Sequence, residues 1–419
     1  MRAPAFALPA PPAVPSVRVR HDRPGRDRPP GHHVDRRDRE PSGISAVTIS
    51  KLVDSGHVVI CCGTGGVGKT TTSAVLALAA ARRGRNAVVV TIDPAKRLAD
   101  TLGLSELGDT AQEIPRSRWD PAGVAKGDGR LSALMLDTEA TFDSLVHKHA
   151  HSKEQAERIL DNRFYRNIAG ALSGTQEYMA MEKLHELHEE GGYDLIIVDT
   201  PPTRHALDFL DAPERLTRLL NNRIFRFLMM PTRRSMKLAS FAAQAFLKTV
   251  AKVIGTEVID DIVAFFRAFE GMEQGFRDRA GRVLELLSEA DTSFVLVTSP
   301  RRDAVDEAEF FAARLRESEL HVAALVVNRV HPDFGVTDDP EQLRRRAKEL
   351  AQTDGDAGDR LSARYENLAD YVQLARHERG ELARAGERIG AGVVAYVPAL
   401  AHDVVDIAAL DAVSFYLVG

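Results

Sequence analysis

The stretch Cys61-Cys62-Gly63-Thr64-Gly65-Gly66-Val67-Gly68-Lys69-Thr70-Thr71 decides how this chain folds. From Gly63 onward it fits G-x-x-x-x-G-K-[ST], the phosphate-binding P-loop pattern. The apolar, β-branched run Val58–Cys62 precedes the turn and predicts a buried strand. The Ala- and Leu-rich run Thr71–Arg83 follows it and predicts a helix that ends at Gly84. Strand, glycine turn and helix in this order form the context that supports the motif.

Each residue type in this stretch suits a triphosphate. Glycines adopt positive φ and let the backbone approach phosphate oxygens without a Cβ clash, and the helix N-terminus favours an anion. Lys69 is expected to reach the β- and γ-phosphates, and the Thr70 hydroxyl to bind Mg²⁺. The motif therefore predicts ATP and Mg²⁺ as cofactors, bound by Gly63 to Thr71. The alternative is a glycine-rich turn without a ligand, which the complete motif disfavours.

Further short apolar runs predict the other strands of the fold. They are Ala87–Ile92, Ala133–Leu136, Leu195–Val198, Phe294–Thr298, Ala323–Val327 and Val393–Val397. Several are continuous rather than alternating, as in strands covered on both faces. Helical patterns such as Glu139–His149 and Asp303–Glu317 lie between them. We therefore predict an α/β fold with a doubly wound, mostly parallel sheet, in which ligands bind at the strand C-termini.

The composition is that of an ordinary folded protein. The 419 residues allow two or more domains or one large α/β domain. The apolar content is 44% and the charged content 27%, which suit a soluble globular chain. The net charge of -5 and the pI near 6.3 give no nucleic-acid footprint. No apolar run is long enough to span a bilayer, so no transmembrane segment is expected.

The two cysteines, Cys61 and Cys62, are neighbours in the predicted strand. Adjacent Cα atoms lie about 3.8 Å apart, whereas a disulfide usually needs roughly 4.4–6.8 Å. Their side chains are expected on opposite faces of the strand. They should therefore neither cross-link nor chelate a metal together, and the lack of a disulfide framework suits a reducing cytoplasm.

Two segments differ in character from the alternating strands and helices. Residues 1–45 are rich in Pro, Arg, Asp and His and predict a disordered tail. Its repeated prolines break the apolar core of a secretory signal, which favours a cytoplasmic protein. The alternative for this tail is a weak basic contact with nucleic acid or lipid. The remaining chain, 46–419, is expected to form the nucleotide-binding domain.

The second such segment, about 213–289, has no predicted strand. Its apolar residues recur at helical spacing, for example Ile262, Phe266 and Phe269, with basic residues between them. We predict a helical insert whose apolar faces pack on the core. The alternative is a surface for a protein client or membrane partner, where Met and Phe adapt to varied shapes. A further helical pair is expected at Asp339–Gln352 and Leu361–Gly390.

Acidic residues follow two of the predicted strands. Asp93, in Thr91-Ile92-Asp93-Pro94-Ala95, is placed to orient a water; its alternative role is an N-cap for the helix at Arg97–Leu102. The run Asp194–Pro202 has four apolar residues closing on Asp199, the Walker B pattern that holds the Mg²⁺ shell. The following Thr203-Arg204-His205 is typical of a switch loop that senses the γ-phosphate.

With these motifs, the chain from about Val58 to Val418 resembles the ArsA family of arsenite-pump ATPases and ATPases that target tail-anchored membrane proteins. The resemblance lies in the P-loop, the switch I run Asp93–Asp100 and the switch II run Asp199–Thr203. Matching segments are Gly174-Thr175-Gln176-Glu177, Val326-Val327-Asn328-Arg329 and Tyr396-Val397-Pro398.

The resemblance implies a role for several of these residues. It implies that Asp93 positions the attacking water, and that Thr70, and Asp199 through water, act at Mg²⁺. It implies that Asn328 recognises adenine and that the loop after Pro398 lies against the base. It also implies a homodimer with two ATP molecules near the interface and a helical subdomain that opens and closes with nucleotide.

The chain departs from the family pattern at three points. Thr64 stands where the family has a signature lysine that reaches the partner subunit's phosphates, so turnover is expected to be slow unless Arg204, Lys96 or Arg97 substitutes. Arsenite needs soft thiolate ligands, and two adjacent thiols on opposite faces do not provide them. No C-x-x-C pair exists to bridge a dimer through zinc.

The leading hypothesis is thus a Mg²⁺-dependent ATPase that couples hydrolysis to opening and closing of a dimer. The first alternative is a nucleotide-dependent binding or targeting module with slow turnover, whose client can be a membrane protein. The second is a membrane-positioning ATPase, although the end of the chain from Val404 contains no Lys or Arg. The third is a small-molecule P-loop kinase, for which no acceptor site is visible.

Overall fold

The computed structural model describes residues 49–92, 97–169, 175–201, 218, 256–332, 335–352 and 355–418. The predicted tail at 1–45 and, except for Arg218, the insert residues 213–255 lie outside these ranges. The described strands are β1 (Val58–Cys62), β2 (Asn86–Thr91), β3 (Gln112–Glu113), β4 (Arg130–Met135), β5 (Leu195–Asp199), β6 (Thr292–Thr298), β7 (Val322–Val330) and β8 (Val393–Pro398).

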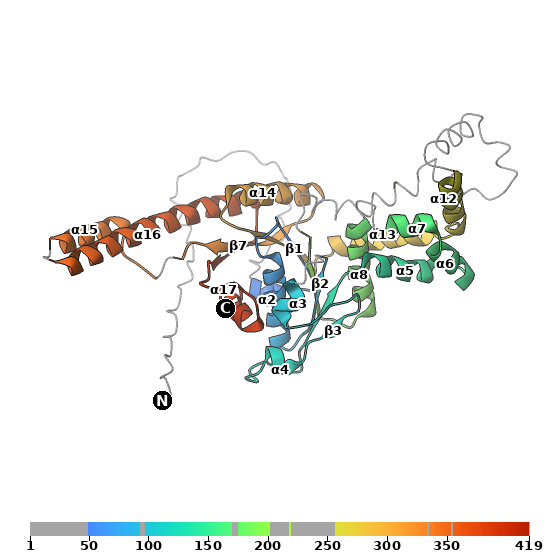
Figure 1. Ribbon diagram of the computed structural model, residues 1–419, viewed down its shortest axis with the longest axis horizontal. Helices are drawn as coiled ribbons and strands as arrows, with labels where there is room; N and C mark the ends of the chain where they lie inside the picture. The colour runs from blue at the N-terminus through green and yellow to red at the C-terminus, as the bar shows by residue number, and fades with distance from the viewer. Residues whose placement is uncertain are drawn as a thin grey trace, which may run out of the picture. The chain divides into compact units, whose positions relative to one another are not determined.

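The described helices are distributed along the whole chain and are coloured by residue number in Figure 1. They are α1 (Ile49–Ser55), α2 (Lys69–Arg82), α3 (Arg97–Leu102), α4 (Arg116–Trp119), α5 (Thr138–His149), α6 (Lys153–Leu160), α7 (Arg163–Ala169), α8 (Thr175–Glu190), α12 (Thr256–Ala268), α13 (Glu273–Ser288), α14 (Arg302–Glu317), α15 (Pro340–Ala351), α16 (Asp356–Ile389) and α17 (Ile407–Leu417). The chain divides into two compact units. One contains Pro332–Arg376, and the other contains the described residues of 46–331 and 377–419.

The larger unit is built on an eight-stranded sheet in the order β3-β4-β2-β5-β1-β6-β7-β8. All neighbouring pairs are parallel except β3–β4, which is antiparallel. The predicted doubly wound, mostly parallel α/β sheet is therefore confirmed, and each of the seven predicted strands overlaps an observed one. The prediction missed β3, which is only two residues long and carries no apolar pattern.

Both faces of the sheet are covered, as the continuous apolar strands predicted. Along β1, Val58, Ile60 and Cys62 belong to one core cluster, and Val59 and Cys61 belong to the other. Helices α1, α2 and α17 contribute to the second cluster, and the Ala and Leu residues of α2 are buried in it. Helices α8, α13 and α14 contribute to the first cluster on the opposite face. The predicted opposite orientation of the two cysteines is confirmed.

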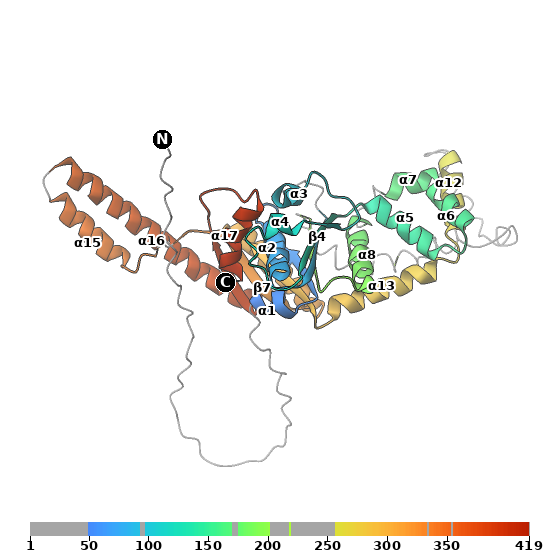
Figure 2. The same cartoon turned by 90° about the horizontal axis from the view of Figure 1, so that it is seen from below.

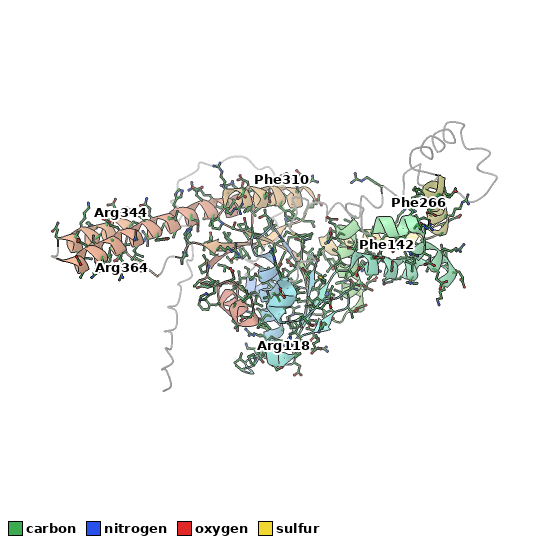
Figure 3. All side chains as sticks on the ribbon, viewed as in Figure 1. Arg118, Phe142, Phe266, Phe310, Arg344 and Arg364 are labelled. Atoms are coloured by element: carbon green, nitrogen blue, oxygen red, sulfur yellow. The ribbon has the colours of Figure 1, made fainter. Side chains whose placement is uncertain are left out.

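An aromatic cluster joins the helices α5, α7, α12 and α13 of the larger unit. Phe265 lies 6.2 Å from Tyr165 and 5.8 Å from Phe269 between ring centroids, and Phe269 lies 5.0 Å from Phe276. Phe142, labelled in Figure 3, lies 6.2 Å from Phe276 on the same side. Within 256–289 the chain forms α12 and α13, which are separated by residues 269–272.

The smaller unit contains α15 and the first part of α16. Leu343, Ala369 and Val372 form its buried cluster, and exposed ion pairs such as Arg344–Asp370, 2.8 Å, lie around it. Arg344 and Arg364 are labelled on this helical pair in Figure 3. The predicted helices at Asp339–Gln352 and Leu361–Gly390 agree with α15 and α16, apart from an earlier start of α16.

Candidate functional site

The turn between β1 and α2 has a backbone that only glycine accepts at two positions. Gly68 has φ of 100°, and a Cβ there would lie 2.2 Å from the Asn328 side-chain nitrogen. Gly63 has φ of 152°, and a Cβ there would lie 2.0 Å from the Val297 carbonyl oxygen. At Gly63 a Cβ would meet backbone, and at Gly68 it would displace the Asn328 side chain from its hydrogen bond to Val67, so both glycines favour packing of the turn against β6 and β7.

The turn is arranged around the Lys69 side chain. The Lys69 Nζ donates to the carbonyl oxygens of Gly63 and Thr64, at 2.9 Å each. The ammonium group, in a side chain that is nearly buried, is therefore held along the inside of the loop. At the start of α2, Gly68 provides no side-chain cap and the first turn carries no acid. The N-terminal N–H groups of a helix attract an anion in this arrangement.

A hydroxyl and a carboxylate meet beside the loop. The Thr70 Oγ1 donates to Asp199 Oδ2 at 2.7 Å, and the Thr91 Oγ1 donates to the same oxygen at 3.1 Å. Asp199 is fully buried at the end of β5, where parallel pairing aligns it with both Cys61 and Thr91. The Thr200 hydroxyl donates to the Cys61 carbonyl oxygen at 2.8 Å and fixes the chain that follows.

A cavity of about 1120 Å³ opens in front of these groups and is called the main cavity below. Its volume slightly exceeds the roughly 300–1000 Å³ of common small-molecule sites. Lys69, Thr70 and Thr200 line it together with the segment after β8. The lining residues are Gly65, Gly66, Gly68, Lys69, Thr70, Thr71, Arg97, Asp100, Thr101, Thr200, Asn328, Arg329, Pro398, Ala399, Leu400, His402, Asp403, Val404, Val405 and Val413.

A smaller cavity of about 300 Å³ lies on the other side of the loop and is called the side cavity below. Thr64 and Val67 line this cavity, together with Arg301 and His331. Two of its side chains have carboxylate partners: Arg301 binds Asp303, and the His331 ring nitrogen lies 2.7 Å from a Glu378 carboxylate oxygen. Thr64 thus lines the side cavity and is not among the residues that line the main cavity.

The structure brings together most of the residues predicted for the site. Gly65, Gly66, Gly68, Lys69, Thr70, Thr71, Asn328 and Pro398 line the main cavity, Thr64 and Val67 line the side cavity, and Gly63 and Asp199 contact Lys69 and Thr70. Asn328 also donates to the Val67 carbonyl oxygen at 2.8 Å, which ties β7 to the loop.

Some predicted residues lie outside the described ranges. These are Asp93, Lys96, Gly174 and the segment 203–205. The residues that flank Asp93 are placed. The Ile92 N–H donates to the Asp199 carbonyl oxygen at 3.1 Å, and the Ile92 carbonyl accepts from the Gln176 side chain at 3.1 Å. Arg97 lines the main cavity.

These features test whether ATP and Mg²⁺ suit the site. A loop that packs too closely for Cβ atoms, an inward lysine and an uncapped helix start fit a polyphosphate. A hydroxyl and a carboxylate 2.7 Å apart are hard oxygen donors, which Mg²⁺ prefers. The residues present therefore fit both groups.

Comparison with known proteins agrees with this geometry. The family described as "Anion-transporting ATPase" matches residues 56–354, well over half of the chain. The chain belongs to the anion-transporting ATPase family. Its relatives include "ATPase get3" of Pyrenophora tritici-repentis, 26% identical over 315 residues, which are 72% of this chain and 82% of the relative. Another is "ATPase ASNA1 homolog 1" of Paramecium tetraurelia, 32% identical over 161 residues, 38% of this chain and 44% of the relative.

The thiols of this ATPase are not placed to bind a metalloid. Cys61 and Cys62 are both buried and free, and they point to opposite faces of β1. Burial raises the pKa of the Cys61 thiol to about 12, and burial also raises that of Cys62. Both thiols are therefore protonated near neutral pH, whereas a soft-metal site needs thiolates. Within the described residues, no helix combines the length and apolar character needed to cross a membrane.

Sequence reasoning missed two contributions to the site of this ATPase. The first is the segment 399–405 beyond Pro398, which was expected near the base but with no named side chain, and which supplies Leu400, His402 and Val405. The second is Arg329, which lines both cavities. Its position directly after Asn328, near the C-terminal end of the parallel strand β7, is the signal that could have identified it.

Proposed function

We propose that this chain hydrolyses ATP with Mg²⁺ and couples hydrolysis to the opening and closing of a homodimer. The observation that carries the proposal is the Thr70–Asp199 pair, 2.7 Å apart, beside a cavity whose lining includes Thr70, Asn328 and Pro398. The lining of this cavity combines an oxygen donor for a metal with the residues expected to contact adenine, and its volume is sufficient for a nucleotide.

Each group has a defined task in this mechanism. The Lys69 ammonium exchanges the carbonyl oxygens of Gly63 and Thr64 for phosphate oxygens and neutralises their charge. The Thr70 hydroxyl and the Asp199 carboxylate, which accepts a hydrogen bond from that hydroxyl, would hold Mg²⁺. When bound, Mg²⁺ would stabilise the negative charge of the phosphoryl group during its transfer. Asn328 and the segment after Pro398 hold the adenine.

We assign the attacking water to Asp93. Its neighbour Ile92 is hydrogen-bonded to the main chain of Asp199 at 3.1 Å, so Asp199 and the residue before Asp93 lie at the ends of adjacent strands. Parallel strands place their C-terminal residues at one edge of the sheet, where such a site forms. A carboxylate there accepts a proton or a hydrogen bond from water as it attacks the γ-phosphate.

The test measures nucleotide binding and phosphate release separately. Lys69→Ala should abolish release and weaken ATP binding. Asp93→Asn should bind ATP as the parent protein does and lose about 10²-fold or more in turnover. Lys126→Ala removes an exposed lysine that lines neither cavity and serves as the control. Unchanged turnover in both Lys69→Ala and Asp93→Asn would exclude the mechanism.

The alternative is a nucleotide-dependent targeting module with slow turnover and a membrane-protein client bound through 213–289. Thr64, an uncharged residue in the loop, favours it, because a cation supplied across an interface is worth about 10³–10⁵ in rate. Light scattering of the Asp93→Asn protein with and without ATP measures whether the chain forms a dimer. Tight ATP binding with negligible turnover of the unmodified chain, with or without added membrane-protein segments, would select the alternative.

A further inference from the structure

Arg329 has a backbone conformation that arginine rarely adopts. Its φ is 63°, and Glu319 is the one other described non-glycine residue with positive φ. Glu319 follows the end of α14, where such a conformation commonly closes a helix. Arg329 instead lies inside β7, where the register with β8 shifts between Asn328 and Val330. Backbone strain at a strand bulge beside a binding loop indicates a functional role for the Arg329 side chain.

The bulge places the Arg329 guanidinium against the phosphate-binding turn. Arg329 is exposed and lines both the main cavity and the side cavity. Its Nη1 donates to the Gly66 carbonyl oxygen at 3.5 Å, the outer limit of a hydrogen bond. Arg329 forms no ion pair with any described residue, although the neighbouring Arg301 and His331 side chains both have carboxylate partners.

A phosphate group in the main cavity would supply the anionic partner that Arg329 lacks among the described residues. A guanidinium presents a planar fork of donors that matches phosphate oxygens better than a single carbonyl does. Before Lys69, the turn residues from Gly63 to Gly68 carry no charge of their own. We propose that Arg329 binds the phosphate chain of the nucleotide, exchanging the weak Gly66 contact for charge-assisted hydrogen bonds. This assignment rests on the proposed ATP site and adds a second cation to it.

The experiment uses substitutions that keep the left-handed backbone. Asparagine tolerates positive φ, so Arg329→Asn removes the charge without added strain. Arg329→Lys keeps the charge. The probe is the non-hydrolysable ATP analogue AMP-PNP with Mg²⁺, measured by calorimetry. Arg329→Asn should weaken binding by about 10-fold to 100-fold, the range for a hydrogen bond to a charged group. The loss of binding free energy in Arg329→Lys should be less than about one third of the loss in Arg329→Asn.

The control is Arg301→Asn, which removes an exposed arginine of the side cavity that is already paired with Asp303. It should leave AMP-PNP affinity within about twofold, because exposed ion pairs contribute little. Thermal midpoints of all variants establish that each is folded. If Arg329→Asn binds as tightly as the unmodified chain, or if Arg329→Lys is as weak as Arg329→Asn, the proposal is wrong. If the unmodified chain itself binds no AMP-PNP, the proposed ATP site fails instead.

Discussion

Removal of Arg279 should be one of the most destabilising single changes in the larger unit. Arg279, on α13, is 2% exposed and Glu182, on α8, is 1% exposed. The Arg279 Nε donates to Glu182, and its Nη1 donates to Glu189 at 2.8 Å. The Tyr178 hydroxyl also donates to Glu182. Arg279→Met would leave the Glu182 carboxylate buried with one neutral donor.

The magnitude follows from which charge is stranded. Breaking a buried pair by removing one partner costs about 3–5 kcal/mol, and Glu182 is at the buried limit. Glu189 should contribute little, because its side chain is 38% exposed and it also faces Lys148 at 3.4 Å. In the double variant Glu182→Gln with Arg279→Met, no charge is stranded and the amide oxygen still accepts from Tyr178. It should recover to within about 1–2 kcal/mol of the unmodified chain.

Urea unfolding followed by circular dichroism gives the free energy of unfolding of the unmodified chain, Arg279→Met, Glu182→Gln and the double variant. Arg282→Met is the matched control, because Arg282 lies on the same helix and is exposed. It should change stability by no more than about 0.5 kcal/mol. The reasoning is refuted if Arg279→Met costs no more than Arg282→Met, or if the double variant is as unstable as Arg279→Met alone.

Three further predictions concern the thiols, acid stability and the loop. Cys61 and Cys62 should not react with Ellman's reagent at pH 8 in the native state, and both should react in urea, because burial raises their pKa values; arsenite should accordingly leave ATP turnover unchanged. Burial and neighbouring cations lower the pKa of His149, so stability should fall as pH drops below about 6.5, the unfolded value. The slope of urea midpoint against pH should flatten in His149→Gln, and an unchanged slope would contradict this. Gly68→Ala should weaken AMP-PNP binding at least tenfold and destabilise the fold by about 1–3 kcal/mol, since its Cβ would meet Asn328 at 2.2 Å; equal binding would show that the loop adapts.

The sequence was sufficient for features that depend on local pattern. Continuous Val and Ile runs predicted seven strands, and the glycine spacing predicted the turn, because burial on both faces and positive φ each require particular residue types. The order of strands was beyond local pattern. It places β5 between β1 and β2, and it is this order that aligns Asp199 with Thr70 and Thr91.

Other features were not accessible because they depend on long-range packing. The helical spacing singled out Phe266 and Phe269, yet Phe265 is buried and Phe266 only partly, since tertiary packing against Tyr165 and Phe269 decides which face of α12 turns inward. The role of Arg329 was hidden for a similar reason. A β-bulge has no residue pattern of its own, and only the register between β7 and β8 reveals it.

Helix α8 gives the site a physical route to the helices beyond the sheet. At its N-terminal end, the Gln176 side chain donates to the carbonyl of Ile92, the residue before Asp93. Further along, Glu182 holds Arg279 of α13, and Figure 2 shows α8 beside α13. Helix α8 is thus hydrogen-bonded to the residue before Asp93 and ion-paired to α13 farther along, a continuous network of contacts of the kind that carries coupling between sites. A movement of Ile92 on nucleotide binding would therefore be transmitted to α13. Arg279→Met should remove the effect of nucleotide on α13 even where ATP still binds, and hydrogen exchange in α13 with and without AMP-PNP measures this effect. An undiminished nucleotide effect in the variant would place the coupling elsewhere.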